Sequence, residues 1–152
     1  TEEYGIGSFV YRARRPFHPQ KFKAFIDRTW PGLIRAKGHF WLSTRTRWVG
    51  EFSLAGAVAR VSGLGYWWAA VNKAEWSREQ VDALHRNPHW HAIWGDRRQE
   101  LVFIGMDMDE AAIRAALDAC LVGTSETERL TKDDFAAFDP FPAWEPAKEA
   151  AE

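Results

Sequence analysis

The chain has 152 residues, of which 46% are hydrophobic, and it carries a formal net charge of −1 and one cysteine. This length is sufficient for one domain with its own core. The single cysteine, Cys120, excludes an internal disulfide and any Cys-x-x-Cys zinc or redox motif. No apolar run approaches the roughly 20 residues of a membrane helix. We therefore expect a cytoplasmic protein with no membrane contact, and the near-neutral charge argues against nucleic acid as its partner.

The first elements along the chain are predicted to be a strand and a helix. Residues 6–11 have the apolar and aromatic composition of a strand. Pro19 is placed to open an amphipathic helix, which has Phe22, Phe25 and Ile26 on one face. We expect this face to pack on a sheet.

Antiparallel strands are expected next. Residues 33–44 and 51–61 are rich in β-forming and aromatic residues. The sequence Ser-Gly-Leu-Gly at 62–65 is typical of a hairpin turn. Residues 57–61 are therefore predicted to pair with residues 66–71.

A short helix and a central strand follow. Ser77 and Gln80 have the spacing of a capping box, and an Asn-Pro pair closes the helix that they open. Residues 100–105 form a nearly continuous apolar run, which is typical of a strand buried on both faces.

The last part of the chain is predicted to hold a helix and a tail. Asp109 should cap a helix over residues 110–121, and Gly123 should end it. Residues 1–123 would then form the domain, and residues 124–152 an acidic tail, containing Pro and Phe, with little regular structure. Four aromatic residues can pin this tail to the domain: Phe135, Phe138, Phe141 and Trp144.

Together these elements predict an α+β fold. Helices should pack on one face of a largely antiparallel sheet of four to five strands. Charge is uneven along this fold, because residues 1–50 carry 10 Lys and Arg against 3 Asp and Glu, whereas residues 101–152 carry 4 against 12. The favoured interpretation is that basic early elements and acidic late elements lie together, and the alternative is a basic face that meets an acidic partner.

Motifs for catalysis are absent from the sequence. It has no phosphate-binding Gly-x-x-x-x-Gly-Lys-Ser/Thr loop, no His-Glu-x-x-His and no Gly-x-Ser-x-Gly. We therefore expect no catalytic residue and no cofactor in this chain.

One group of residues has metal-ligand chemistry. His85, His89 and His91 lie within seven residues, and neutral imidazole is a good ligand for zinc. Pro88 breaks the helix between the first two, so their spacing does not guarantee that they converge. We favour loop histidines beside Trp90 and keep a zinc site as the alternative.

Tryptophan and arginine supply the candidates for protein contact. The chain has nine tryptophans, and aromatic side chains with arginines at the rim concentrate binding energy at interfaces. The candidate contacts form two patches, Trp90, Trp94, Arg97 and Arg98 in one, and Arg12, Arg14 and Arg15 in the other. Core packing is the alternative for the tryptophans, and a solvated sheet surface for the arginines.

Basic residues also alternate with aromatic ones in the first third of the chain. Arginines and Lys37 lie among Phe17, Phe40, Trp41 and Trp48, an arrangement that can stack single-stranded nucleic acid. No RNP-type motif is present. We favour strands whose aromatic residues form the core and whose charges are solvated.

Four segments in order carry a family resemblance: Tyr4–Pro19, Arg35–Arg45, Gly95–Gly105 and Asp139–Trp144. They resemble the C-terminal domain of the CobW-type GTPases, a metallochaperone group that includes zinc-responsive members and proteins named for cobalamin synthesis. The resemblance implies a parent protein whose N-terminal domain is a P-loop GTPase with a Cys-x-Cys-Cys metal site. Neither motif exists in these residues, and the first residue is Thr1, so we expect a piece of a longer protein.

The leading hypothesis is a non-catalytic accessory domain of a GTP-dependent, zinc-handling chaperone. It would recognise a client metalloprotein or couple to the GTPase domain of its parent, which alone would bind GTP and Mg²⁺. The alternatives are an auxiliary histidine module that binds zinc and a domain that binds single-stranded nucleic acid.

Overall fold

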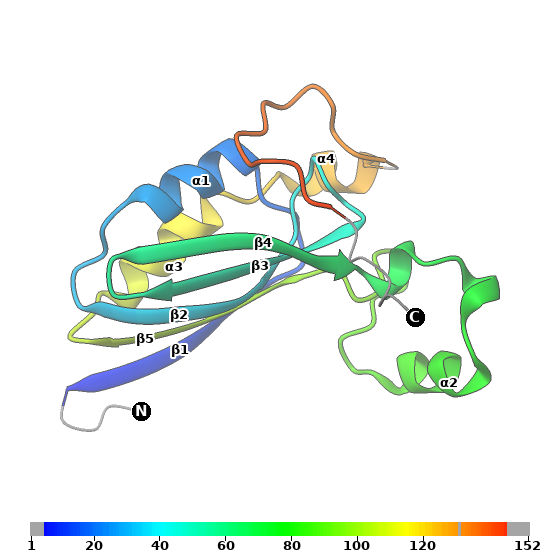
Figure 1. The fold of residues 1–152 in the computed structure, drawn as a ribbon, viewed down its shortest axis with the longest axis horizontal. Helices are drawn as coiled ribbons and strands as arrows, with labels where there is room; N and C mark the ends of the chain where they lie inside the picture. Colours follow the sequence, from blue (N-terminus) through cyan, green and yellow to red (C-terminus); the bar gives the residue numbers. More distant parts are fainter. Residues whose placement is uncertain (1–4, 131, 146–152) are drawn as a thin grey trace.

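The computed structural model describes residues 5–130 and 132–145, and it contains a five-stranded sheet with helices (Figure 1). The strands are β1 (Ile6–Ala13), β2 (Leu33–Phe40), β3 (Trp48–Ala55), β4 (Val58–Tyr66) and β5 (Gln99–Met106). The helices are α1 (Pro19–Asp27), α2 (Arg78–Arg86), α3 (Glu110–Asp118) and α4 (Thr124–Arg129), with short 3-10 turns at Trp68–Ala70 and Lys73–Glu75.

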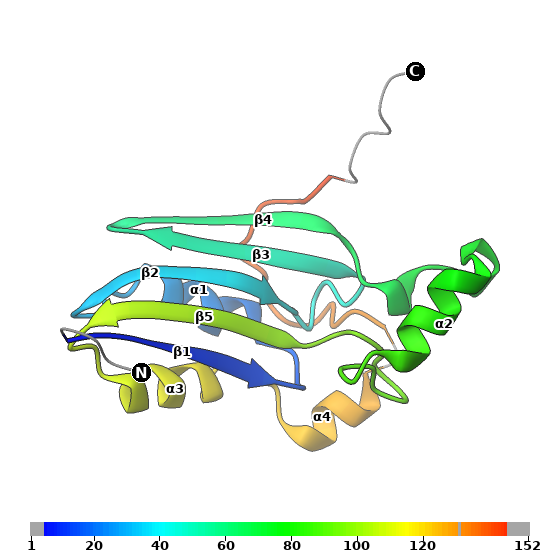
Figure 2. The same cartoon turned by 90° about the horizontal axis from the view of Figure 1, so that it is seen from below.

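The strand order in the sheet is β1-β5-β2-β3-β4, and every neighbouring pair is antiparallel. Strand β5 comes late in the chain but lies between β1 and β2. Helices α1 and α3 cover one face of the sheet, and no helix of the described residues lies on the opposite face (Figures 1 and 2). The predicted α+β class, with an antiparallel sheet and helices on one face, is confirmed.

Phenylalanine rings fill the core between the sheet and α1. The ring of Phe22 lies 4.6 Å from that of Phe17 and 4.7 Å from that of Phe40. Phe25 is buried beside them and Ile26 is half-buried, as the amphipathic pattern of α1 predicts. On the other side of the core, the Tyr11 hydroxyl of β1 donates to Asp118 of α3 at 2.8 Å.

The predicted hairpin at residues 62–65 is wrong. Strand β3 ends at Ala55, the turn is made by Gly56 with a φ of +60°, and residues 62–65 lie within β4. Gly63 is needed because a Cβ there would lie 2.7 Å from the side chain of Trp144. The neighbouring Leu64 is the extra residue of a β-bulge. The bulge also explains why this strand contains residues that are typical of a turn.

Strand β5 is buried on one face only, contrary to the prediction. Leu101 and Phe103 point into the core, whereas Val102, Ile104 and Met106 are 37%, 39% and 45% exposed on the helix-free face. The run is continuous because β5 places apolar side chains both in the core and on the face of the sheet that no described helix covers.

Helix starts agree with the sequence better than helix ends. The capping box of α2 is present, and the Asp109 carboxylate accepts from the Ala112 amide at the start of α3. Helix α3 ends at Asp118, three residues before the predicted end. Gly123 opens α4, so the first part of the predicted irregular tail is helical.

The rest of the tail crosses the helix-covered side of the sheet. Phe141 is buried in the core and Trp144 packs on Phe40 and Trp48, as predicted. Phe135 and Phe138 do not pin the tail, because they are 80% and 68% exposed.

Candidate functional site

Residues 67–98 form a lobe beyond the ends of β4 and β5, which we call the tryptophan lobe (Figures 1 and 2). Trp76 packs edge-on against both Trp68 and Trp90, with ring centroids 6.4 and 6.0 Å apart. Trp94 lies 5.5 Å from the buried Trp41 of the main domain. The tryptophans therefore build a small core within the lobe and join it to the sheet.

Arg14, at the end of β1, fastens the lobe to the sheet. Its guanidinium donates to the carbonyl oxygens of Gly95, Arg97 and His89. Arg97 donates in turn to the Thr46 carbonyl at 2.7 Å. Both arginines are half-buried, and this burial lowers the pKa of their guanidinium groups.

A second set of polar contacts fixes the start of the lobe. The buried Asp96 carboxylate accepts from the amides of Trp68 and Ala69, both at 3.0 Å. Arg98 and Arg12 both donate to Glu100. Burial opposes ionisation of Glu100, but these two arginines outweigh it and hold its pKa below the usual value.

The sequence-predicted contact residues thus fall into two groups. Trp90, Trp94, Arg14 and Arg97 make contacts within the domain, and Arg98 donates to the Asp96 carbonyl and to Glu100. Arg12 is exposed and Arg15 is half-buried, and both stay predictions as partner contacts. The most exposed large apolar residue of the lobe is Ile93 at 73%, which no periodic pattern singles out.

The three candidate zinc ligands differ in their surroundings. His85 is exposed on α2, and the His89 carbonyl is bound to Arg14. The His91 Nδ1 accepts from the amides of Ile93 and Trp94 at 3.0 and 3.1 Å, so it offers only Nε2 to a ligand. Within residues 5–130 and 132–145, no group of three or more His, Cys, Asp or Glu is placed to hold a metal ion.

The aromatic residues of the basic first third lie inside the molecule. Phe17, Phe40 and Trp41 are fully buried, and Trp48 is half-buried against Tyr66 and Trp144. The favoured interpretation of these strands, aromatic core and solvated charge, is confirmed for the three buried rings. Among the described helices, none is long and apolar enough to cross a membrane.

The helix-free face of the sheet is a mixed apolar and basic surface, which we call the open face. Cross-strand pairing places Met106 opposite Ile6, Ile104 between Ser8 and Arg35, and Val102 between Val10 and Lys37. Directly opposite residues share a face of the sheet, so apolar side chains of β1 and β5 adjoin the cations of β2. Arg35 and Lys37 are exposed and, in the described part of the chain, have no ion-pair partner.

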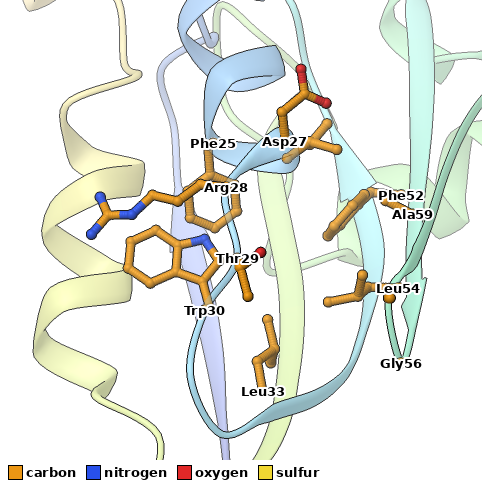
Figure 3. Close-up of a pocket in the computed structure, with 12 residues that line it drawn as sticks. Phe25, Asp27, Arg28, Thr29, Trp30, Leu33, Phe52, Leu54, Gly56 and Ala59 are labelled. Carbon is orange, nitrogen blue, oxygen red and sulfur yellow. The ribbon is translucent and has the colours of Figure 1, made fainter.

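A hollow of about 220 Å³ opens on the other side of the sheet, between the end of α1 and the β3–β4 hairpin (Figure 3). Its walls are apolar and aromatic, and Asp27, Arg28 and Thr29 lie at its edge. The residues that form the walls are Phe25, Trp30, Leu33, Phe52, Leu54 and Ala59. Sequence reasoning missed this site, because its residues come from two segments that are distant in the chain, 25–33 and 52–59.

Residues 6–121 match the family described as the cobalamin synthesis protein cobW C-terminal domain. This match covers most of the chain, and the chain belongs to this family. The resemblance expected from the sequence is therefore confirmed.

Known relatives place the family among zinc-handling GTPases. The chain is 35% identical over 130 residues to the zinc-regulated GTPase metalloprotein activator 1 of Dictyostelium discoideum, covering 83% of this chain and 27% of the relative. It is 32% identical over 136 residues to a zinc chaperone of Mycobacterium tuberculosis, covering 88% of this chain and 34% of the relative. The chain thus spans between a quarter and about a third of these proteins.

A solved structure has a similar fold. The Zn(II)-bound YjiA GTPase from E. coli superposes with a TM-score of 0.53 at 17% identity, over 78% of this chain and 30% of that chain. At this identity the likeness concerns the fold alone.

Proposed function

We propose that this chain is the non-catalytic interaction domain of a GTP-dependent zinc chaperone, and that its open face docks on the GTPase domain of the same parent protein. Family membership supports the class of parent, since named relatives are a zinc-regulated GTPase and a zinc chaperone. The chain matches only part of each relative, so a domain of this kind works beside a larger neighbour.

The observation that carries the docking proposal is the apolar character of β5 on the open face. Val102, Ile104 and Met106 are exposed there although β5 is an interior strand with a neighbour on each side. A contiguous apolar patch bordered by cations is typical of a protein interface rather than of a solvated sheet. Arg35 and Lys37 supply the border, and they favour a partner surface with carboxylates.

The test is a titration of the ¹⁵N-labelled chain with the GTPase domain of its parent, expressed separately. We expect chemical-shift changes along β1, β5 and β2, and we expect Ile104→Asp to weaken binding at least tenfold, about 1.4 kcal/mol. The control is Ile93→Asp, which changes a more exposed apolar residue in the tryptophan lobe. If Ile93→Asp abolished binding and Ile104→Asp did not, the interface would be the lobe and the proposal would be wrong.

A further inference from the structure

We propose that the hollow beside Trp30 is a peptide-binding site, which takes one large apolar side chain from an acidic segment of a partner protein. This inference deepens the proposed function and rests on it, because it assigns client recognition to the helix-covered side of the sheet and leaves the open face for the GTPase domain.

The size and position of the hollow suit a single side chain. Helices α1 and α3 cover the sheet up to β2, and the end of the β3–β4 hairpin extends past them (Figures 1 and 2). The aromatic rings of Phe25, Trp30 and Phe52 form the walls of a space of about 220 Å³. Pockets for whole organic ligands measure about 300–1,000 Å³, so this space fits a leucine or phenylalanine side chain better than a cofactor.

The wall of the hollow also contains a hydrogen-bond donor without a partner. The Trp30 Nε1 is buried and has no hydrogen-bond partner in the described structure. In Figure 3 this nitrogen lies on the edge of the indole that faces the space toward β3. A buried N–H without a partner is costly, and a main-chain carbonyl of a bound peptide would satisfy it if the indole turned toward the ligand on binding.

The rim of the site is basic. The Arg28 guanidinium lies 4.0 Å from the centre of the Trp30 ring, and Arg28 is exposed. Asp27 also lies at the edge, but its carboxylate is paired with Lys23 at 2.5 Å. Within the described residues Arg28 has no ion pair, so it is available to a carboxylate of the ligand.

A second hollow continues the site across α1. It measures about 450 Å³, lies between α1 and α3, and shares Phe25, Arg28 and Trp30 with the first. Its floor consists of small residues, Ala24, Ala116, Ala119 and Cys120, and Lys21 lies at its edge. A peptide whose apolar side chain enters the first hollow can therefore extend over the second, with acidic residues beside Lys21 and Arg28.

The probes for the test are synthetic heptapeptides with one central leucine or phenylalanine flanked by glutamates. The same peptides with lysine in place of glutamate are the charge control. Binding is followed by the indole N–H signal of Trp30 in NMR spectra of the ¹⁵N-labelled chain, assigned with Trp30→Phe. We expect saturable shifts with the glutamate peptides, at least fivefold weaker binding after Arg28→Glu, and further weakening as salt is added.

Two variants on the same hairpin distinguish binding in the hollow from peptide binding elsewhere on the chain. Ala59→Phe fills the hollow, whereas Ala55→Phe places the same side chain on the open face, because Ala59 pairs with Leu54 and Ala55 with Val58. We expect the first to remove the Trp30 shift and the second to retain it. Equal shifts in both variants, or no shift with any peptide at millimolar concentration, would overturn the inference.

The same variants distinguish this inference from the proposed function. Ala59→Phe should leave binding of the GTPase domain unchanged. If the peptides fail and the GTPase domain still binds the open face, only the peptide site is wrong. If the GTPase domain fails to bind while the peptides shift Trp30, the docking proposal is the one that fails.

Discussion

Arg45 holds Asp139 through two parallel hydrogen bonds, 2.8 Å from Nε to Oδ2 and 3.0 Å from Nη2 to Oδ1. The same guanidinium donates to the carbonyl oxygens of Phe141 and Pro142 and lies 4.4 Å from the centre of the Trp144 ring. One side chain from the loop after β2 thus contacts three of the residues between 139 and 144 directly and a fourth through its ring. The Arg45–Asp139 pair is also an example of the expected contact between a basic residue from the first part of the chain and an acidic residue from the last part.

Replacing Asp139 by Asn should destabilise the chain by about 2 kcal/mol at pH 7, because a charge-assisted bidentate pair is lost. Burial raises the pKa of Asp139, but its hydrogen bonds from Arg45, Thr44 and the Phe141 amide outweigh this and lower the pKa below the usual value. The stabilisation is therefore complete above about pH 4, the pKa of an unfolded Asp, and is lost as the pH falls through the folded-state value.

The measurement is urea unfolding of both proteins between pH 7 and pH 2. We expect the difference in unfolding free energy to shrink toward zero at the acid end. The control is Asp82→Asn, an exposed carboxylate on α2, which should change stability by less than about 0.5 kcal/mol. If the difference in unfolding free energy between Asp139→Asn and the unchanged chain did not depend on pH, the assigned role of the charge would be wrong.

Replacing Arg14 by Lys should loosen the tryptophan lobe. Lysine keeps the charge but cannot reach three carbonyl oxygens with a planar fork, so we expect a loss of about 2–3 kcal/mol. Hydrogen exchange of the Trp68, Ala69 and Gly95 amides should become faster while β3 and β4 are unchanged. Arg12→Lys, at an exposed salt bridge, is the control and should cost no more than about 1 kcal/mol. Uniform acceleration across the sheet would show that Arg14 supports the whole fold instead.

Replacing Gly63 by Ala should displace Trp144. The new Cβ would lie 2.7 Å from Trp144 atoms, a distance that forces the indole or the strand to move. We expect a loss of about 1–3 kcal/mol and faster proteolysis of the tail. Ser62→Ala, at an exposed neighbouring position whose side chain points to the opposite face, should have little effect. Equal stability of the two variants would mean that Trp144 does not restrict position 63.

Zinc titration against a chromophoric chelator tests the histidine hypothesis. We expect no competition by the chain, because the His91 Nδ1 is occupied by two amides and His85 lies apart on α2. The matched variant is His89→Ala/His91→Ala, measured alongside. Tight one-to-one binding that disappears in the double variant would establish a metal site in the lobe and overturn this prediction.

Local signals in the sequence predicted the helix starts well. The capping box of Ser77 and Gln80, the Asp109 cap and the proline at Pro19 each act within four residues, so neighbouring sequence contains the whole cause. The error at Gly63 has the opposite origin, because the reason for that glycine is Trp144, which is distant in the chain.

Much of the candidate site could not be read from the sequence for the same reason. The importance of Arg14 depends on where the Gly95 and Arg97 carbonyls lie. Every residue has a backbone carbonyl, so the sequence does not show which carbonyls will accept from an arginine. The hollow beside Trp30 exists only when α1 and the β3–β4 hairpin are placed on the sheet. The exposure of one face of β5 could not be predicted, because a continuous apolar run has the same sequence pattern whether its second face contacts a helix or solvent.

The position of β5 also determines the order in which the chain can fold. Strands β2, β3 and β4 are joined by short connections and can pair locally, but β1 and β2 have no contact in the sheet until β5 enters between them. That step closes a loop that contains the whole tryptophan lobe, and long-range closure of this kind slows folding. During synthesis on the ribosome, β1 therefore has no partner strand from this sheet until the chain has emerged beyond Met106.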